Sequence, residues 1–174
     1  LLRDAVTLPS VLGLIDAPSP EVRMRAVAAA SALLDPARSD GRAVEPILDR
    51  LSDPELGRAE RIALVDLLGR TGSPRAAGAL LGLVSAPDPR LTKAAIRALA
   101  ELRSVSAPVD AALLVQLDDE RGEIRAEAAL ALGRVGDPKL ASALLQRLEQ
   151  AAEVDRGALG IALSGLLARS DDGA

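Results

Sequence analysis

The feature that constrains this chain most is an apolar triplet that recurs at a nearly constant spacing. Each triplet has apolar residues at positions i, i+1 and i+4, which places all three on one face of a helix. The five copies are Val11-Leu12-Ile15, Ile47-Leu48-Leu51, Leu80-Leu81-Val84, Leu113-Leu114-Leu117 and Leu144-Leu145-Leu148. Successive copies begin 36, 33, 33 and 31 residues apart. Fixed periods of this length are typical of helical solenoids, so the chain is predicted to be a stack of repeated units.

A second helical pattern alternates with the triplets. Residues 21–36 and 123–138 share Glu, a β-branched residue, Arg, two Ala positions and a final Asp-Pro. Residues 59–74 share a Gly-Arg-x-Gly-x-Pro ending, residues 89–102 keep only the apolar spacing, and residues 154–169 begin a last unit without a second helix. Glycine ends a helix in the left-handed conformation, and Asp or Ser followed by Pro starts the next helix. Each full unit is therefore predicted to be a helical hairpin, with full units at residues 19–52, 54–86, 89–119 and 121–150 and half-units at 1–17 and 154–169.

The composition favours helices and excludes several kinds of chemistry. The 174 residues include no Phe, Tyr or Trp and one Met, so the core must consist of Ala, Leu, Val and Ile. Ala and Leu are strong helix formers, and no alternating run predicts a strand, so an all-α fold is predicted. The absence of Cys and His excludes disulfides, thiolate nucleophiles, zinc clusters and imidazole acid–base chemistry.

Charge and hydropathy limit the partners of the chain. The net charge of −4 argues against a nucleic-acid surface, which normally carries a basic excess. No apolar stretch reaches the roughly 18 to 20 residues of a membrane-spanning helix. A Cys-free chain without a signal segment is expected in the cytoplasm. Because it begins with Leu1-Leu2 rather than Met, it is expected to be a segment of a longer chain.

These motifs together resemble a known repeat family. The pattern "D-P-x-x-x-V/I-R-x-x-A-x-x-A-L-G-x-x-G-D-P" followed by "A-x-x-x-L-L-x-x-L" is similar to HEAT-like repeats, especially the short bacterial type first noted in phycobilisome lyases. It extends over residues 8–169 and matches best at 121–149, whereas "RSVSAP" replaces the glycine turn within 89–117. The resemblance implies a right-handed α-solenoid of antiparallel helix pairs, with about four repeats, a half-unit at each end, and second helices on the concave face. It says little about activity, because such repeats have many unrelated roles.

Three arginines occupy one equivalent position in the first helix of their units. They are Arg23, Arg61 and Arg125. The resemblance implies that each forms an ion pair with an acidic residue of the adjacent repeat, which would make a structural ladder. The candidate acidic partners are Asp53, Asp88 and Asp118 or Asp119.

The two positions between the second and third member of each triplet must point away from the core or to its edge. Solvent favours charge there, yet Leu14, Leu83 and Val115 are apolar. Gly78 and Gly82 lie four apart on one helix face, where each costs roughly 1 kcal/mol relative to Ala but allows another backbone to approach. These outward positions of successive second helices form a ridge on which a partner helix or peptide could dock. There are two alternatives. Neighbouring second helices could pack tightly there, or the apolar residues could be ordinary isolated exposed side chains. The candidate partner-binding residues are Leu14, Asp49, Arg50, Gly78, Gly82, Leu83, Val115, Gln116, Gln146 and Arg147, and the charged residues of the ridge, with Glu45 and Glu149, are mixed in sign.

The last predicted helix is apolar almost all round. It contains Gly157, Gly160 and Gly165, whereas the terminal helix of a solenoid normally has a polar outer face. Its expected apolar patch consists of Leu159, Ile161, Leu163, Leu166 and Leu167. A missing second helix, a homodimer mate or a partner protein is expected to cover this patch. The alternative is that it is simply an imperfect cap, like the half-unit with Leu1 and Leu2 at the other end.

No catalytic constellation is apparent in the sequence. The acidic runs at 118–120 and 170–172 fall at a turn and in a tail, and no phosphate-binding glycine loop or nucleophile motif occurs. The leading hypothesis is a non-enzymatic protein-interaction scaffold or regulatory module, without cofactor or metal, that binds a partner helix or peptide on its second helices. Kinship with bilin lyases offers a chromophore-handling enzyme as an alternative, although no aromatic, His or Cys is present to assist. Helical-repeat DNA glycosylases share the architecture too, but an acidic chain without aromatics fits nucleic acid poorly.

Overall fold

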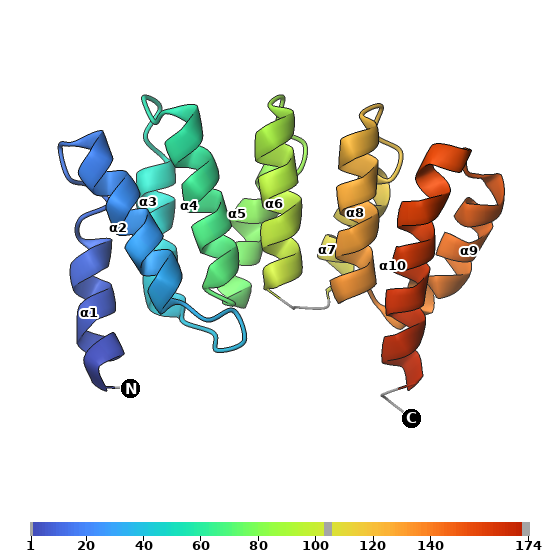
Figure 1. Ribbon diagram of the computed structural model, residues 1–174, viewed down its shortest axis with the longest axis horizontal. Helices are drawn as coiled ribbons and strands as arrows, with labels where there is room; N and C mark the ends of the chain where they lie inside the picture. The colour runs from blue at the N-terminus through green and yellow to red at the C-terminus, as the bar shows by residue number, and fades with distance from the viewer. Residues whose placement is uncertain (1, 103–105, 172–174) are drawn as a thin grey trace.

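The computed structural model describes residues 2–102 and 106–171, which form ten α-helices in two layers (Figure 1). The first layer holds the first helix of each unit, and the second layer holds the second helices. The first helices are α2 (Pro20–Leu33), α4 (Arg58–Arg70), α6 (Pro89–Glu101), α8 (Gly122–Val135) and α10 (Glu153–Asp171). The second helices are α1 (Leu2–Leu12), α3 (Val44–Leu51), α5 (Ala77–Leu83), α7 (Ala107–Gln116) and α9 (Ala141–Gln150). The prediction of an all-α solenoid is confirmed.

Short 3₁₀ turns and capping side chains join the two helices of a hairpin. The turns η1 (Gly41–Ala43), η2 (Pro74–Ala76) and η3 (Pro138–Leu140) lead into α3, α5 and α9. Asp40 and Asp137 cap η1 and η3 by accepting hydrogen bonds from the backbone N–H groups of Arg42 (3.1 Å) and Lys139 (2.9 Å). These contacts satisfy donors that have no partner within a turn, as predicted for aspartate ahead of a helix.

The two glycines expected to end first helices behave differently. Gly72, after α4, has φ 57°, the left-handed conformation that the sequence predicts. Gly136, after α8, instead has φ −63° and ψ 152°, which is extended backbone open to any residue. A Cβ atom on Gly136 would lie 2.7 Å from the carbonyl oxygen of Leu132, so lack of space explains this glycine. The prediction of a left-handed turn is wrong at this position.

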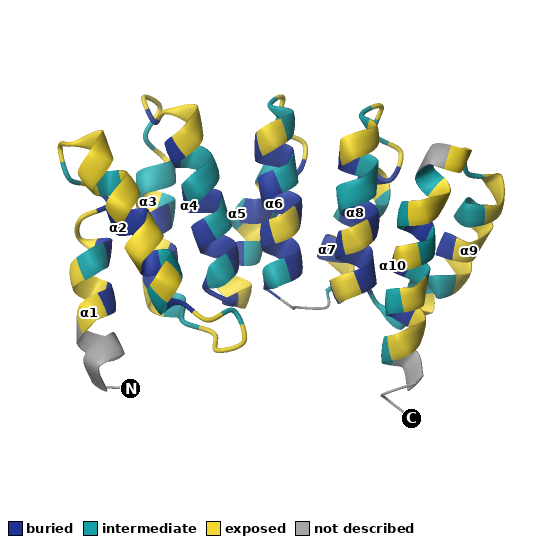
Figure 2. Ribbon diagram, in the orientation of Figure 1, coloured by how far each residue is buried: buried dark blue, intermediate teal, exposed yellow. Residues whose placement is uncertain are grey.

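The core lies between the two layers (Figure 2). The first member of four triplets is fully buried: Ile47, Leu80, Leu113 and Leu144. Across from them, the first helices contribute large buried side chains such as Leu64, Ile96, Ile124 and Leu132. The helical period of the apolar residues therefore locates the core.

Neighbouring first helices approach closely through small residues. A Cβ atom on Gly69 in α4 would lie 2.6 Å from the Cα of Ala98 in α6. A Cβ atom on Gly133 in α8 would lie 2.9 Å from the Cα of Ala162 in α10. Real Cβ atoms do not approach so closely, so glycine is what allows the backbones of the first layer to touch.

Candidate functional site

The fourth residue of every first helix donates a hydrogen bond to the loop that precedes that helix. The acceptors are backbone carbonyl oxygens, so the contact ties each unit to the one before it. The bonds are Arg23 to Ala17 (2.9 Å), Arg61 to Leu51 (3.0 Å), Thr92 to Ala86 (3.0 Å), Arg125 to Asp119 (2.9 Å) and Arg156 to Ala151 (3.2 Å). Arg156 and Thr92 occupy the same position as the three arginines singled out by sequence, and Thr92 makes the contact with a hydroxyl instead of a guanidinium.

Two of the arginines also bind a carboxylate of the next first helix. Arg23 donates to both oxygens of Glu60 at 2.7 and 2.9 Å, and Arg125 donates to Asp155 at 3.1 Å. Glu60 and Asp155 are both the third residue of their helix. Glu60 is 8% exposed, and the hydrogen bond from Arg23 is the main cause that lowers its pKa. These bonds form an ion-pair contact between adjacent units.

The carboxylates that bind these arginines are not the four loop aspartates considered from the sequence. Each of those aspartates instead forms an ion pair with a different arginine. The pairs are Asp53 with Arg50 (2.9 Å), Asp88 with Arg58 (2.8 Å), Asp118 with Arg147 (2.5 Å) and Asp119 with Arg121 (2.7 Å). The loops contribute backbone carbonyls to the ladder, and the first helices contribute the carboxylates.

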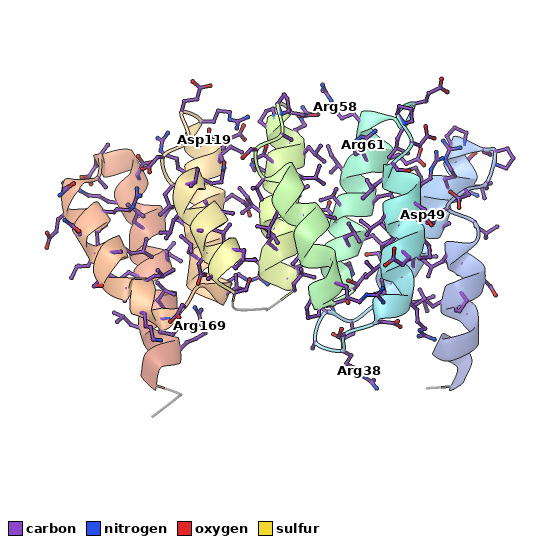
Figure 3. All side chains as sticks on the ribbon, turned by 180° about the vertical axis from the view of Figure 1, so that it is seen from behind. Arg38, Asp49, Arg58, Arg61, Asp119 and Arg169 are labelled. Carbon is purple, nitrogen blue, oxygen red and sulfur yellow. The ribbon has the colours of Figure 1, made fainter. Side chains whose placement is uncertain are left out.

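The second-helix face carries the ten candidate partner-binding residues, but the structure leaves only six of them open. Figure 3 shows this face, with Asp49 on α3. The exposed residues are Leu14, Asp49, Gly78, Gly82, Val115 and Gln146. A Cβ atom added to Gly78 or Gly82 would have no atom of a neighbouring element within 4 Å among the described residues, so the second helices do not meet there. The close approach expected at these two glycines occurs instead at Gly69 and Gly133.

The other four candidates have contacts within the protein. Leu83 is half-buried and packs against the core, and Gln116 is only 5% exposed, with its amide nitrogen 3.4 Å from the hydroxyl of Ser85. Arg50 binds Glu60 at 3.1 Å, and Arg147 binds Asp118. The open part of the second-helix face is thus smaller and less charged than the sequence indicated.

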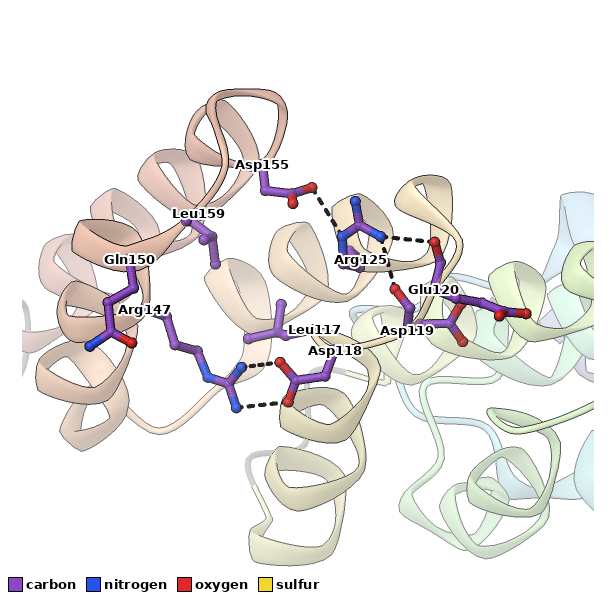
Figure 4. A pocket seen from close by; sticks show the side chains of 10 residues that line it. Leu117, Asp118, Asp119, Glu120, Arg125, Arg147, Gln150, Asp155 and Leu159 are labelled. Carbon is purple, nitrogen blue, oxygen red and sulfur yellow. Dashed lines mark hydrogen bonds and ion pairs between the residues drawn. The ribbon is translucent and has the colours of Figure 1, made fainter.

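A pocket of about 480 Å³ opens where α7 and α9 end, beside the start of α8 and α10 (Figure 4). Leu117 and Leu159 give it apolar walls. Its charged lining consists of four carboxylates and two guanidinium groups: Asp118, Asp119, Glu120, Asp155, Arg125 and Arg147. The sequence alone indicates only a capping or solvated run at 118–120 and does not reveal this pocket. One sequence signal could have identified Asp155 as a pocket residue. It is the acidic third residue of its helix α10, and it lies one repeat after Arg125.

Two of the carboxyl groups that line this pocket have a lowered pKa. The Arg121 guanidinium hydrogen-bonded to Asp119 lowers the pKa of that carboxyl to about 2. The hydrogen bond from Arg147 likewise lowers the pKa of Asp118. Asp118, Asp119 and Asp155 are each in an ion pair with an arginine, namely Arg147, Arg121 and Arg125. With Arg121 counted, four carboxylates face three guanidinium groups, so the pocket has a small excess of negative charge.

The last helix α10 exposes only part of its expected apolar patch. Leu159 is 7% exposed and Leu166 is fully buried, because both face α8 and α9. Leu163 is half-buried, whereas Ile161 and Leu167 are 60% and 49% exposed. The helix therefore has a packed face and an open face, and it is not uniformly exposed. None of the helices in the described part of the chain is long and apolar enough to cross a bilayer.

Comparisons with known proteins agree with this architecture. Residues 44–123 match a family model described as HEAT repeats. The fold is similar to the complex of CpcE and CpcF of phycocyanin lyase from Nostoc sp. PCC7120, with a TM-score of 0.70 and 18% identity. That match covers 91% of this chain and 64% of the other, so the chain spans less than two thirds of that relative. No curated protein matches the chain in sequence.

Designed repeat proteins have a similar fold. A designed armadillo repeat protein in complex with the peptide (KR)4 matches with a TM-score of 0.63 and 20% identity, over 95% of this chain and 84% of the other. A computationally designed armadillo repeat protein for modular peptide recognition gives a TM-score of 0.59 at 20% identity, over 94% and 84%. At these identities the likeness concerns the fold alone.

Proposed function

We propose that this chain, a HEAT-like repeat protein, is a non-enzymatic scaffold that binds an extended segment of another protein along its second helices. The observation that carries the proposal is the open strip on α5 and α7. Val115 is 65% exposed, and no neighbouring element in the described residues comes within 4 Å of a Cβ at Gly78 or Gly82. An apolar side chain beside a stretch almost free of side chains offers a bound segment both apolar surface and access to helix backbone.

The acidic pocket adds a preference for basic partners. It lies at the ends of α7 and α9, so a segment that crosses Val115 can place a side chain in it. The methylenes of a lysine or arginine would pack against Leu117 and Leu159, and its charge would lie near Glu120. Support for this mode of binding also comes from the designed armadillo relative, which is in complex with a peptide of Lys and Arg.

Replacing Val115 by arginine is expected to weaken binding of such a segment at least about tenfold. This is the change in Kd that follows from the loss of one well-placed apolar contact. A phage-displayed peptide library selected against the wild-type chain supplies the probe, and fluorescence anisotropy of the selected peptide gives its Kd. Because Val115 is largely exposed, the variant is expected to keep its circular dichroism spectrum and its urea midpoint. Leu83→Asp would be a poorer test, because Leu83 packs against the core.

The matched control is Leu130→Arg, which changes an apolar residue 39% exposed on α8 in the other layer. It is expected to leave the Kd unchanged within about twofold, since it adds the same charge away from the strip. If Leu130→Arg weakens binding as much as Val115→Arg, the partner does not use the second-helix face. If the selected peptides contain no Lys or Arg, the proposed role of the pocket is contradicted. The proposed binding along the open strip on α5 and α7 is not.

A further inference from the structure

The ion-pair contact between adjacent units is incomplete at the junction of α4 with α6. At the α8–α10 junction the Nε atom of Arg125 donates to Asp155 at 3.1 Å, and the α2–α4 junction has the equivalent pair. Arg61 is the corresponding arginine of α4, but the third residue of α6 is Leu91, which has no carboxylate. This junction therefore has the arginine of the contact without its acidic acceptor.

The guanidinium group of Arg61 is held by the loop before its helix. Its Nη1 and Nη2 atoms donate to the backbone carbonyl oxygens of Leu51 and Asp53, both at 3.0 Å. Its Nε atom is the one that binds a carboxylate at the other two junctions, and here it has no hydrogen-bond acceptor among residues 2–102 and 106–171. Arg61 is also in no ion pair within those ranges, so its half-buried charge lacks a carboxylate.

A pocket of about 330 Å³ opens beside Arg61, between the start of α4 and the loop that leads into α6. Leu56, Ile62 and Leu91 give it apolar walls. Leu56 is 7% exposed and Leu91 is 9% exposed, so these walls are fixed by packing in the core. The volume is at the lower end of the range for small-molecule sites, about 300 to 1,000 Å³.

The other charged side chains of this pocket are paired with each other. Arg58 binds the carboxylate of Asp88 at 2.8 Å, and Asp88 also accepts a hydrogen bond from the backbone N–H of Arg90 at 3.0 Å. Figure 3 labels Arg58 and Arg61 at the start of α4. Because the pair of Arg58 with Asp88 is neutral, Arg61 leaves the pocket with one positive charge.

The acidic pocket occupies the equivalent place two units later in the chain, and its chemistry differs. Leu56 stands where that pocket has Glu120. Leu91 likewise stands where it has Asp155. Both pockets keep the arginine of the ladder. The same place in the repeat thus has an excess of carboxylates in one unit and a guanidinium group without a carboxylate, among leucines, in another.

We infer that this second pocket binds a small aliphatic carboxylic acid in its ionised form, with the carboxylate on Arg61 and the hydrocarbon chain against the apolar walls. The ligand carboxylate takes the place of the acidic side chain in the complete junctions, where a charge-assisted hydrogen bond is stronger than a neutral one. A peptide would also bring amide groups. Within the described part of the chain, no other polar side chain of the lining lacks a partner for them, so the free acid is favoured.

Nuclear magnetic resonance of the methyl-labelled chain, titrated with isocaproate, tests the inference. The acid is expected to shift the methyl signals of Leu56, Ile62 and Leu91, with a Kd of about 1 mM or lower. Isocaproamide, which has the same chain and no charge, is expected to bind at least about tenfold more weakly. Acetate is expected to give no measurable shift, because each buried methylene contributes about fourfold to affinity.

Two variants remove the site by different routes. Arg61→Gln removes the charge and is expected to weaken isocaproate binding at least about tenfold. Leu91→Glu supplies the missing carboxylate to Arg61, as α4 does with a glutamate at this position, and is expected to abolish binding and keep the circular dichroism spectrum. The matched control is Arg97→Gln, which removes the same charge from an exposed arginine of α6 that pairs with Asp66. It is expected to leave the Kd unchanged within about twofold.

Isocaproate that shifts no methyl signal at about 10 mM would overturn the inference, and so would equal binding of the acid and the amide. If Arg61→Gln does not fold, the amide and Leu91→Glu decide the question. A tripeptide ending in leucine that binds over about tenfold tighter than isocaproate would overturn the free acid and indicate a chain terminus instead. Leu91→Glu is expected to bind the selected peptide of the proposed function as the wild type does, because that segment uses α5 and α7. The two proposals can therefore fail separately.

Discussion

A chain in which Gly69 is replaced by valine is expected to lose about 3 kcal/mol of its free energy of unfolding. The Cβ of the new side chain would lie 2.6 Å from the Cα of Ala98 and 2.9 Å from its Cβ. Both neighbouring atoms belong to a helix backbone or its first side-chain atom, so no flexible group can move aside. The helices α4 and α6 must separate, and the apolar contacts on both sides of the junction are weakened. Urea unfolding followed by circular dichroism measures the loss.

The control for this experiment changes a glycine in the other layer. Gly82→Ala is expected to stabilise the chain by up to about 1 kcal/mol, because alanine favours the helix and restricts the unfolded chain. Among the described residues, no atom of a neighbouring element lies within 4 Å of a Cβ at Gly82, so the added methyl group has space. Equal and small effects at Gly69 and Gly82 would contradict the close backbone contact between first helices.

Replacing Glu60 by alanine is expected to cost about 3 kcal/mol, the range found when one partner of a buried ion pair is removed. Glu60 accepts hydrogen bonds from Arg23 and Arg50, whose side chains are only 14% and 15% exposed. Without the carboxylate, two guanidinium groups with restricted access to water repel each other. Glu60→Gln keeps an acceptor oxygen and is expected to cost less. Thermal and urea unfolding of both variants measure the difference.

The same residue gives the stability a dependence on pH. Because the pKa of Glu60 is lowered in the folded chain, first by Arg23 and then by Arg50, its contribution is complete above the unfolded value of about 4.3. That contribution is lost as the pH falls through the lower folded pKa. The free energy of unfolding of the wild type should therefore fall on acidification below about pH 4, and this slope should be shallower in Glu60→Gln. An identical acid slope in the two chains would contradict the ion pair.

Three other carboxyl groups act in the opposite direction at higher pH. Burial raises the pKa of Asp66, Glu101 and Asp110. A raised folded pKa favours the protonated form in the folded state, so stability rises as the pH falls through these values toward the ordinary carboxyl range. The stability of the wild type is therefore expected to be greatest at mildly acidic pH.

The fold could be predicted from the sequence because the information needed is local. A triplet such as Leu80-Leu81-Val84 specifies one helix face, and Asp-Pro or Gly-x-x-Gly specifies where helices begin and end. Burial of Leu80 at 0% and of Val84 at 4% follows directly from that period. Even so, the helical period could not distinguish the left-handed Gly72 from the extended Gly136, because neighbouring side chains decide the backbone there.

The candidate site was harder to predict because contacts with residues distant in the chain decide which of its side chains stay exposed. Gln116 and Val115 are adjacent and both were expected on the ridge, yet Val115 is 65% exposed and Gln116 is 5% exposed. Rotation about the helix axis brings Gln116 against Ser85 of the previous unit. Arg147 was expected to meet a partner and instead binds Asp118, 29 residues away. The helical period indicates which residues point away from the core. It does not specify which of those residues are then covered by another unit.

The backbone contact between first helices also determines how the stack can deform. Where Gly69 touches Ala98 and Gly133 touches Ala162, the first layer can neither shorten nor lengthen without losing contact. Bending then leaves that layer at constant length and changes the separation of the second helices, which have open space around Gly78 and Gly82. In a bent elastic strip the layer that keeps its length is the neutral axis, and the close contacts of α4 with α6 and of α8 with α10 place that axis in the first layer. If the chain binds an extended segment as we propose, small changes of curvature would adjust the distance between successive second helices to the spacing of the side chains on that segment.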